Sequence, residues 1–149
     1  MILGFLLTSC ENDDDVCVSG EATPRLKIKF KSADNKVLTL DSLYLDVDYG
    51  NNNVLTVVKA AKVDSALIPI RVDDAGFTEL YVRKTKKGSV SKIKLNYNTT
   101  SEYVSPACGF KRLYQNLSGT LETANPVTKV ELNQNQIINE NKAHLYLVF

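Results

Sequence analysis

The chain has 149 residues, 44% of them hydrophobic and 23% charged, and its 18 Lys and Arg residues nearly balance 17 Asp and Glu. This length suits one domain with a sizeable core. A net charge of +1 argues against the basic surface of a nucleic-acid-binding domain, so we expect no nucleic-acid partner. Because the chain has a single His, we also expect no metal ion, no cofactor and no catalytic residue.

The first ten residues, MILGFLLTSC, resemble the end of a bacterial lipoprotein signal peptide. Leu7-Thr8-Ser9-Cys10 matches the lipobox of such signals, which implies cleavage before Cys10 and a lipid on its thiol. Residues 1–9 are then a signal-peptide remnant and residues 10–23 a lipidated, acidic tether. No basic residue precedes Cys10, as a secretory signal requires, so we expect the true start to lie upstream. The alternative is an apolar first strand in which Cys10 is incidental.

Three cysteines are an odd number, which needs an explanation in an exported protein. If Cys10 carries lipid, Cys17 and Cys108 remain as a pair, and an exported domain lies in an oxidising compartment. A disulfide between them would close nearly the whole domain in one loop. The alternative is two buried free thiols.

From residue 24 onward the chain follows the period of two that is typical of half-buried strands. Leu26, Ile28 and Phe30 alternate with lysines, and a second alternating run ends at the turn Gly50–Asn53. Pro69 interrupts an apolar run and predicts an edge strand. The predicted strands are 26–31, 43–49, 54–58, 66–72, 77–83, 90–97, 102–105, 120–123, 127–132 and 143–149.

One stretch departs from this rhythm. Phe110, Leu113, Tyr114 and Leu117 have the i, i+3, i+4, i+7 spacing of one helix face, which predicts a short helix ending near Gly119. We therefore expect an all-β fold over residues 24–149: an antiparallel β-sandwich of the immunoglobulin or transthyretin type, with eight to nine strands and one short helix. A barrel is the alternative.

Three segments together resemble a family of small lipoproteins from Bacteroidota, known only as a domain of unknown function. They are residues 15–26, residues 103–111 with the sequence YVSPACGFK, and residues 139–144. The resemblance implies a lipid-anchored β-domain in which Cys17 and Cys108 are paired. It implies no catalytic residue.

Two further features are similar to those of envelope proteins from that phylum. The acidic residues Glu11, Asp13, Asp14 and Asp15 resemble the signal that directs lipoproteins to the cell surface, although a solvated tether is the alternative. Asp41-Ser42-Leu43 and Asp64-Ser65-Ala66 resemble its O-glycosylation motif, which makes Ser42 and Ser65 candidate sites. We expect an outer-membrane lipoprotein on the periplasmic or cell-surface side.

Motifs for other chemistry are weak. Ser89-Val90-Ser91-Lys92 fits S-x-x-K but opens a strand, which turns Ser89 and Lys92 to opposite faces. Residues 46–51 resemble a calcium loop without the Gly and Glu positions that it needs. The Lys27, Lys29 and Lys31 row and the cluster at residues 83–87 could favour anionic partners, but a solvated face is the simpler interpretation. We expect a structural role for His144.

Two hypotheses for function remain. The first is a non-enzymatic, lipid-anchored module that presents loops or edges to another envelope protein. The second is an extracytoplasmic module that binds glycans or peptides. The absence of Trp disfavours a stacking platform for sugars, whereas seven Tyr leave it open.

Overall fold

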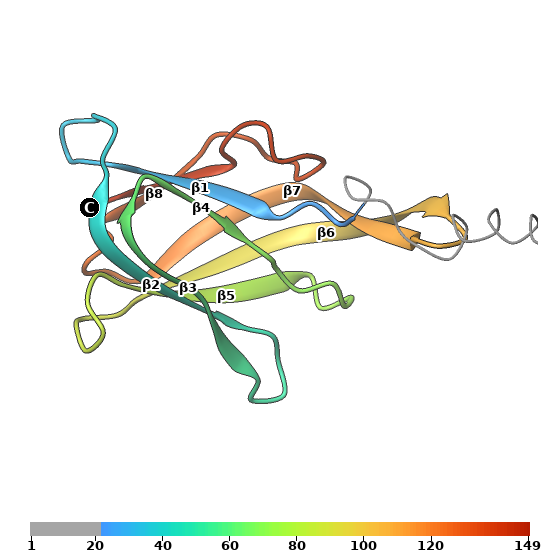
Figure 1. Ribbon diagram of the computed structural model, residues 1–149, viewed down its shortest axis with the longest axis horizontal. Coiled ribbons are helices and arrows are strands. Elements are labelled where there is room, and N and C mark those ends of the chain that lie inside the picture. Colours follow the sequence, from blue (N-terminus) through green and yellow to red (C-terminus); the bar gives the residue numbers. More distant parts are fainter. Residues whose placement is uncertain (1–21) are drawn as a thin grey trace, which may run out of the picture.

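The computed structural model describes residues 22–149, and Cys10 and Cys17 lie outside this range. The described chain folds into nine strands in two sheets, which confirms the all-β, sandwich-like expectation, and it contains no helix (Figure 1). The strands are β1 (Leu26–Lys31), β2 (Leu40–Asp48), β3 (Val54–Val63), β4 (Ser65–Ile68), β5 (Phe77–Arg83), β6 (Ser91–Ser105), β7 (Gly109–Thr123), β8 (Lys129–Leu132) and β9 (Leu145–Val148).

The sheets have the orders β4-β1-β9-β8 and β3-β2-β5-β6-β7, and the core lies between them. Apolar residues at every second position of a strand form this core. In β1, for example, Leu26, Ile28 and Phe30 are fully buried, while the intervening lysines are only partly buried. The period-two pattern therefore predicted correctly which face of this strand is buried. Because the sheets form two separate layers with open ends, the arrangement is a sandwich rather than a closed barrel.

One strand pair departs from the antiparallel expectation. β1 runs parallel to β9, with Ile28 opposite Leu145 and Lys31 opposite Val148, while all other strand pairs are antiparallel. Parallel neighbours need a long connection between them, and here that connection is nearly the whole domain. The first and last strands thus lie side by side.

The predicted helix at residues 110–117 is wrong, because this segment belongs to β7. The ladder between β6 and β7 shifts register so that Asn116 and Leu117 lie opposite the single residue Tyr97, and Asn116 has a left-handed φ of 54°. This is a β-bulge. The extra residue brings Tyr114 and Leu117 to the same buried face, which gives a strand the spacing of a helix.

Other elements differ in length. The predicted strands at residues 90–97 and 102–105 are parts of one strand, β6, and residues 120–123 are the end of β7. β4 lies at a sheet edge, as Pro69 predicted, and it ends immediately before that residue. β3 is longer than predicted, at 10 residues.

Candidate functional site

The most prominent feature of the molecule is an arm formed by the ends of β6 and β7, which extend together beyond the sandwich (Figure 1). Paired residues run from Asn98 opposite Gln115 to Ser105 opposite Gly109. Side chains on both faces of this part of β6 are exposed or only half-buried, whereas in the first half of β6 every second residue is buried. The arm consequently packs far less than the strands from which it extends.

Buried aromatic and hydroxyl side chains hold the root of the arm. The rings of Tyr97 and Tyr114 meet edge to face with centroids 5.0 Å apart. The Tyr97 hydroxyl lies 2.6 Å from Thr78 Oγ1, and the Tyr114 hydroxyl donates to the Arg71 carbonyl at 3.1 Å. Burial raises the pKa of both tyrosines, so each remains a neutral hydrogen-bonding group at physiological pH. This cluster ties β5, β6 and β7 to the segment that follows β4.

Arg112 holds the arm further from the sandwich than this cluster, at the position where it lies opposite Ser101. Its guanidinium donates to the Val72 carbonyl at 2.8 Å and to Ser101 Oγ at 2.6 Å, and it forms an ion pair with Asp74. Its backbone N–H donates to Thr23 Oγ1 at 2.9 Å. A single residue thus joins β7, β6, the loop before β5 and the start of the described chain.

The tip of the arm is aromatic and exposed. Tyr103 and Phe110 are paired across the two strands, with ring centroids 5.3 Å apart and exposed fractions of 56% and 66%. The turn beyond them is closed by a hydrogen bond from the Cys108 N–H to Ser105 Oγ at 3.0 Å. Tyr103 and Phe110 are the two aromatic residues among the exposed large hydrophobic side chains of residues 22–149.

A cavity of about 590 Å³ lies between the side of the arm at Lys111 and the segment that leads into β1. Arg25 binds Glu140 at its wall through Nε–Oε2 and Nη2–Oε1 contacts of 2.9 and 3.1 Å, and the Arg25 N–H donates to the same carboxylate at 2.8 Å. These hydrogen bonds hold the pKa of Glu140 below its usual range. Lys111 also lines the cavity. Residues from all three segments that carry the family resemblance therefore converge here.

His144 is buried and bonded through both ring nitrogens. Nδ1 accepts from the Lys27 N–H at 2.8 Å, so the proton lies on Nε2, which donates to the Asn139 carbonyl at 3.1 Å. The His144 N–H donates in turn to the Lys27 carbonyl. Burial lowers the pKa of the ring. The imidazole therefore continues the β1–β9 ladder as a backbone acceptor would, which agrees with the structural role expected for it.

The open edge of the larger sheet is β3. Its residues are exposed or half-buried on both faces, and they include Leu55 and Val54 with exposed fractions of 50% and 48%. Leu55 lies opposite the buried Val47, so its side chain is on the core-facing side of the sheet, where the other sheet does not cover it. Among the described strands, β3 pairs with β2 alone.

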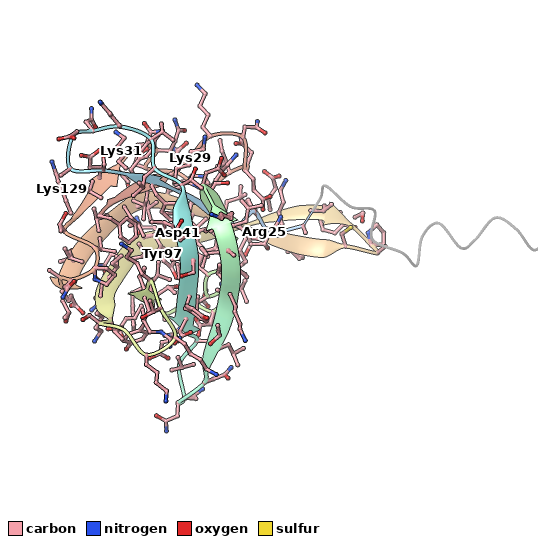
Figure 2. The ribbon with its side chains drawn as sticks, turned by 60° about the vertical axis from the view of Figure 1, so that its left-hand side comes forward. Arg25, Lys29, Lys31, Asp41, Tyr97 and Lys129 are labelled. Atoms are coloured by element: carbon pink, nitrogen blue, oxygen red, sulfur yellow. The ribbon has the colours of Figure 1, made fainter. Side chains whose placement is uncertain are left out.

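The lysine row lies on the outer face of the smaller sheet, as alternation predicted (Figure 2). Lys31 donates to Glu131 at 3.1 Å and lies 4.2 Å from the centre of the Tyr146 ring. Lys129 lies 3.5 Å from the same carboxylate group. In the second basic cluster, Arg83 is 3.2 Å from Asp46. Acidic and aromatic partners thus offset part of the positive charge.

The structure places the predicted site residues apart from one another. Cys10 and Cys17 are outside the described residues, so lipidation and the Cys17–Cys108 pairing stay predictions, while Cys108 lies at the tip of the arm. Ser42 in β2 and Ser65 in β4 are half-buried, and the Ser42 hydroxyl donates to the Lys84 carbonyl. Their glycosylation also stays a prediction.

The weak motifs have other partners. Lys92 of the S-x-x-K match lies 3.1 Å from Glu79 and 3.5 Å from Glu122, and Ser91 Oγ accepts from the Val127 N–H. In the calcium-like segment, Asp48 Oδ1 accepts from the Gly50 N–H within its own turn. Residues 22–149 contain no group of three or more His, Cys, Asp or Glu that could hold a metal ion.

Sequence reasoning missed the arm and the open β3 edge. The arm residues Asn98–Glu102 are polar on both faces and therefore carry no alternation to extend the strand. In β3 the run of apolar residues was visible, but whether the opposite sheet covers it depends on how many strands that sheet has. Neither feature had a decisive local signal.

Residues 37–149, well over half of the chain, match the model of a family of unknown function, DUF6452. The chain belongs to this family. The match spans β2 to β9 and includes the whole arm. The chain matches no curated protein and no solved structure. Within the described part of this DUF6452 member, no helix is long and apolar enough to cross a membrane.

Proposed function

We propose that this DUF6452 protein is a non-enzymatic interaction module of the bacterial cell envelope. It is anchored to the outer membrane through lipid on Cys10, and it binds an extended segment of another envelope protein along β3. The lipobox-like sequence before Cys10 supports the anchor, and the odd number of cysteines is consistent with it. The open edge of β3 is the observation that carries the binding activity.

The case for β3 rests on a comparison of the four sheet edges. β4 and β8 have four residues each, and Pro69 follows β4 directly. The edge of β7 is covered in its middle, where Tyr114 exchanges two backbone hydrogen bonds with Ile137 and the Leu117 N–H donates to the Asn135 carbonyl. Natural sheets usually protect a long apolar edge in such ways. Lys59 and Lys62 give β3 part of this protection, but its first half, residues 54–58, carries no charge and includes exposed apolar side chains.

An edge of this kind selects an extended partner. Backbone hydrogen bonds would add the partner as a sixth strand of the larger sheet, and alternate side chains would supply specificity. Leu55 and Val58 offer apolar contacts on one face, and the exposed Lys59 and Lys62 favour carboxylates in the partner. We therefore infer an extended, partly apolar segment with acidic residues.

Site-specific photo-cross-linking in the native cells tests this proposal. A photoreactive residue at Ala60 of β3 should give one discrete adduct, whereas the same residue at the exposed Leu132 of β8 should not. A peptide from the captured protein should then bind the purified full chain. Leu55→Asp removes an apolar contact and repels the carboxylates of the partner, so it should abolish that binding, while Val37→Asp in the loop before β2 should preserve it.

Three outcomes would contradict the proposed binding. Equal adducts at Ala60 and Leu132, or peptide binding that survives Leu55→Asp, would show that β3 is not the site. An adduct between two copies of this chain would indicate a dimer instead. The anchor has a separate test: a fatty-acid analogue should label the wild type but not Cys10→Ala, and an unlabelled wild type would refute lipidation.

The glycan-binding alternative gains no support from the cavity beside the arm. Its wall consists of aliphatic, amide and charged side chains together with Thr23, and no aromatic ring lines it. Sugars bind by stacking on such rings as well as by hydrogen bonds. The peptide form of that alternative is the one that the β3 edge favours.

A further inference from the structure

The tip of the arm exposes its two aromatic rings to solvent in a position where the sandwich cannot cover them. Tyr103 and Phe110 contact each other, yet their side chains stay 56% and 66% exposed because the arm projects beyond the sandwich (Figure 2). A free two-stranded ribbon is marginally stable in water. The Tyr97–Tyr114 cluster holds this ribbon at its root, and Arg112 holds it further along. These contacts keep the tip in its projecting position.

The start of the described chain lies against the middle of the same arm. Thr23 Oγ1 accepts from the Arg112 N–H, and Ala22 to Arg25 line the cavity beside it. Cys10 precedes Thr23 by 13 positions, so a fully extended connection spans at most about 45 Å. If Cys17 is paired with Cys108, only seven positions separate the lipidated residue from the arm tip, or about 25 Å.

We infer that the arm tip is a membrane contact: Tyr103 and Phe110 insert into the interfacial layer of the bilayer that holds the lipid on Cys10. This inference rests on the proposed anchor. The residue types fit the location, since Phe supplies an apolar ring and Tyr an apolar ring with a polar hydroxyl, which suits the boundary between headgroups and acyl chains. Beside them, Lys111 lies 3.3 Å from Glu102, so the strands carry a neutralised charge pair next to the rings.

This contact would give the domain a fixed orientation. A lipid anchor alone leaves a domain free to rotate about its attachment point, whereas a second contact at the arm tip restrains it. Lys31 of the lysine row and Lys129 of β8 lie at the end of the sandwich away from the arm in Figure 2. The tip, rather than this basic face, would then meet the bilayer.

The chain contains no Trp, so a single introduced Trp reports its own environment. We would prepare the full chain with six histidines inserted after residue 10 and hold it on phosphatidylethanolamine–phosphatidylglycerol vesicles that contain a nickel-chelating lipid. This tether keeps the protein at its native anchor point whether or not Cys10 is lipidated. Phe110→Trp preserves the aromatic pair with Tyr103, and Val37→Trp is the matched control at an exposed position of the β1–β2 loop.

On vesicles, we expect the emission of Phe110→Trp to shift to shorter wavelength and to be quenched by brominated acyl chains, while Val37→Trp keeps its solution spectrum. Water-like emission of Phe110→Trp on the vesicles would overturn the inference. Equal quenching of both variants would also overturn it, because the domain would then lie on the lipid without preference for the arm. Fatty-acid labelling of Cys10 decides the proposed anchor separately, so the two failures are distinguishable.

Discussion

Replacing His144 by Leu tests whether its ring acts as part of the β1–β9 ladder. Leu retains much of the buried volume but removes both hydrogen bonds, so the buried Lys27 N–H loses its acceptor and the Asn139 carbonyl loses its donor. Leaving a buried donor unsatisfied costs about 1–3 kcal/mol, and a lost hydrogen bond about 0.5–1.5 kcal/mol. We therefore expect the free energy of unfolding to fall by about 2–4 kcal/mol.

The same variant should change the pH dependence of stability. Burial lowers the pKa of His144 in the folded state, so the unfolded chain binds its proton first as the pH falls. The contribution of this ring is complete above the unfolded pKa, near 6.5, and is lost as the pH falls from there through the folded pKa. The slope is at most about 1.4 kcal/mol per pH unit. His144→Leu should lack this component.

Urea denaturation at pH 7.5 and at pH 5, followed by circular dichroism, measures both effects. Lys142→Ala is the matched control, because it alters an exposed side chain in the segment just before β9 and should stay within about 0.5 kcal/mol of wild type. A His144→Leu protein as stable as this control at pH 7.5 would refute the role of the ring. Equal stability losses between pH 7.5 and pH 5 in wild type and His144→Leu would refute the pH argument.

Three further changes address the bulge, the Arg112 contacts and the cysteines. Asn116→Ala should lower the free energy of unfolding by about 1 kcal/mol, since a φ of 54° is strained for most side chains. Asn116→Gly should be near neutral in the same urea titration. Equal losses of stability in the two variants would argue against the bulge. Arg112→Lys should speed amide hydrogen exchange in the arm without changing exchange in β1, and uniform exchange would contradict the role of Arg112 in holding the arm. Reduction should destabilise the wild type by up to about 4 kcal/mol and leave Cys108→Ser unchanged; a wild type indifferent to reductant would argue against the predicted disulfide.

Alternation along the chain was enough to predict which residues of most strands are buried. β1 and β5 occur where the pattern placed them, because their neighbours cover one face and leave the other to solvent. Pro69 likewise predicted the edge position of β4, since its missing N–H cannot join a central ladder. These are local properties, and the residues themselves carry them.

The helix at residues 110–117 failed because spacing alone cannot distinguish a bulged strand from a helix. Tyr114 and Leu117 share a buried face only because Asn116 accommodates a left-handed turn opposite Tyr97, and that turn depends on pairing with β6. The parallel pairing of β1 with β9 could not be predicted from local patterns either, since it joins the two ends of the domain.

Residue patterns along the chain were sufficient to predict the all-β class and the buried faces of most strands, and the pattern at Cys10 predicts a lipid anchor. Which features are exposed for contact depends instead on how the strands pack together. β3 is uncovered because the opposite sheet has four strands rather than five. The tip with Tyr103 and Phe110 is exposed because β6 and β7 extend beyond the core. Exposure depends on what packs nearby, and that is a property of the whole fold rather than of any one segment.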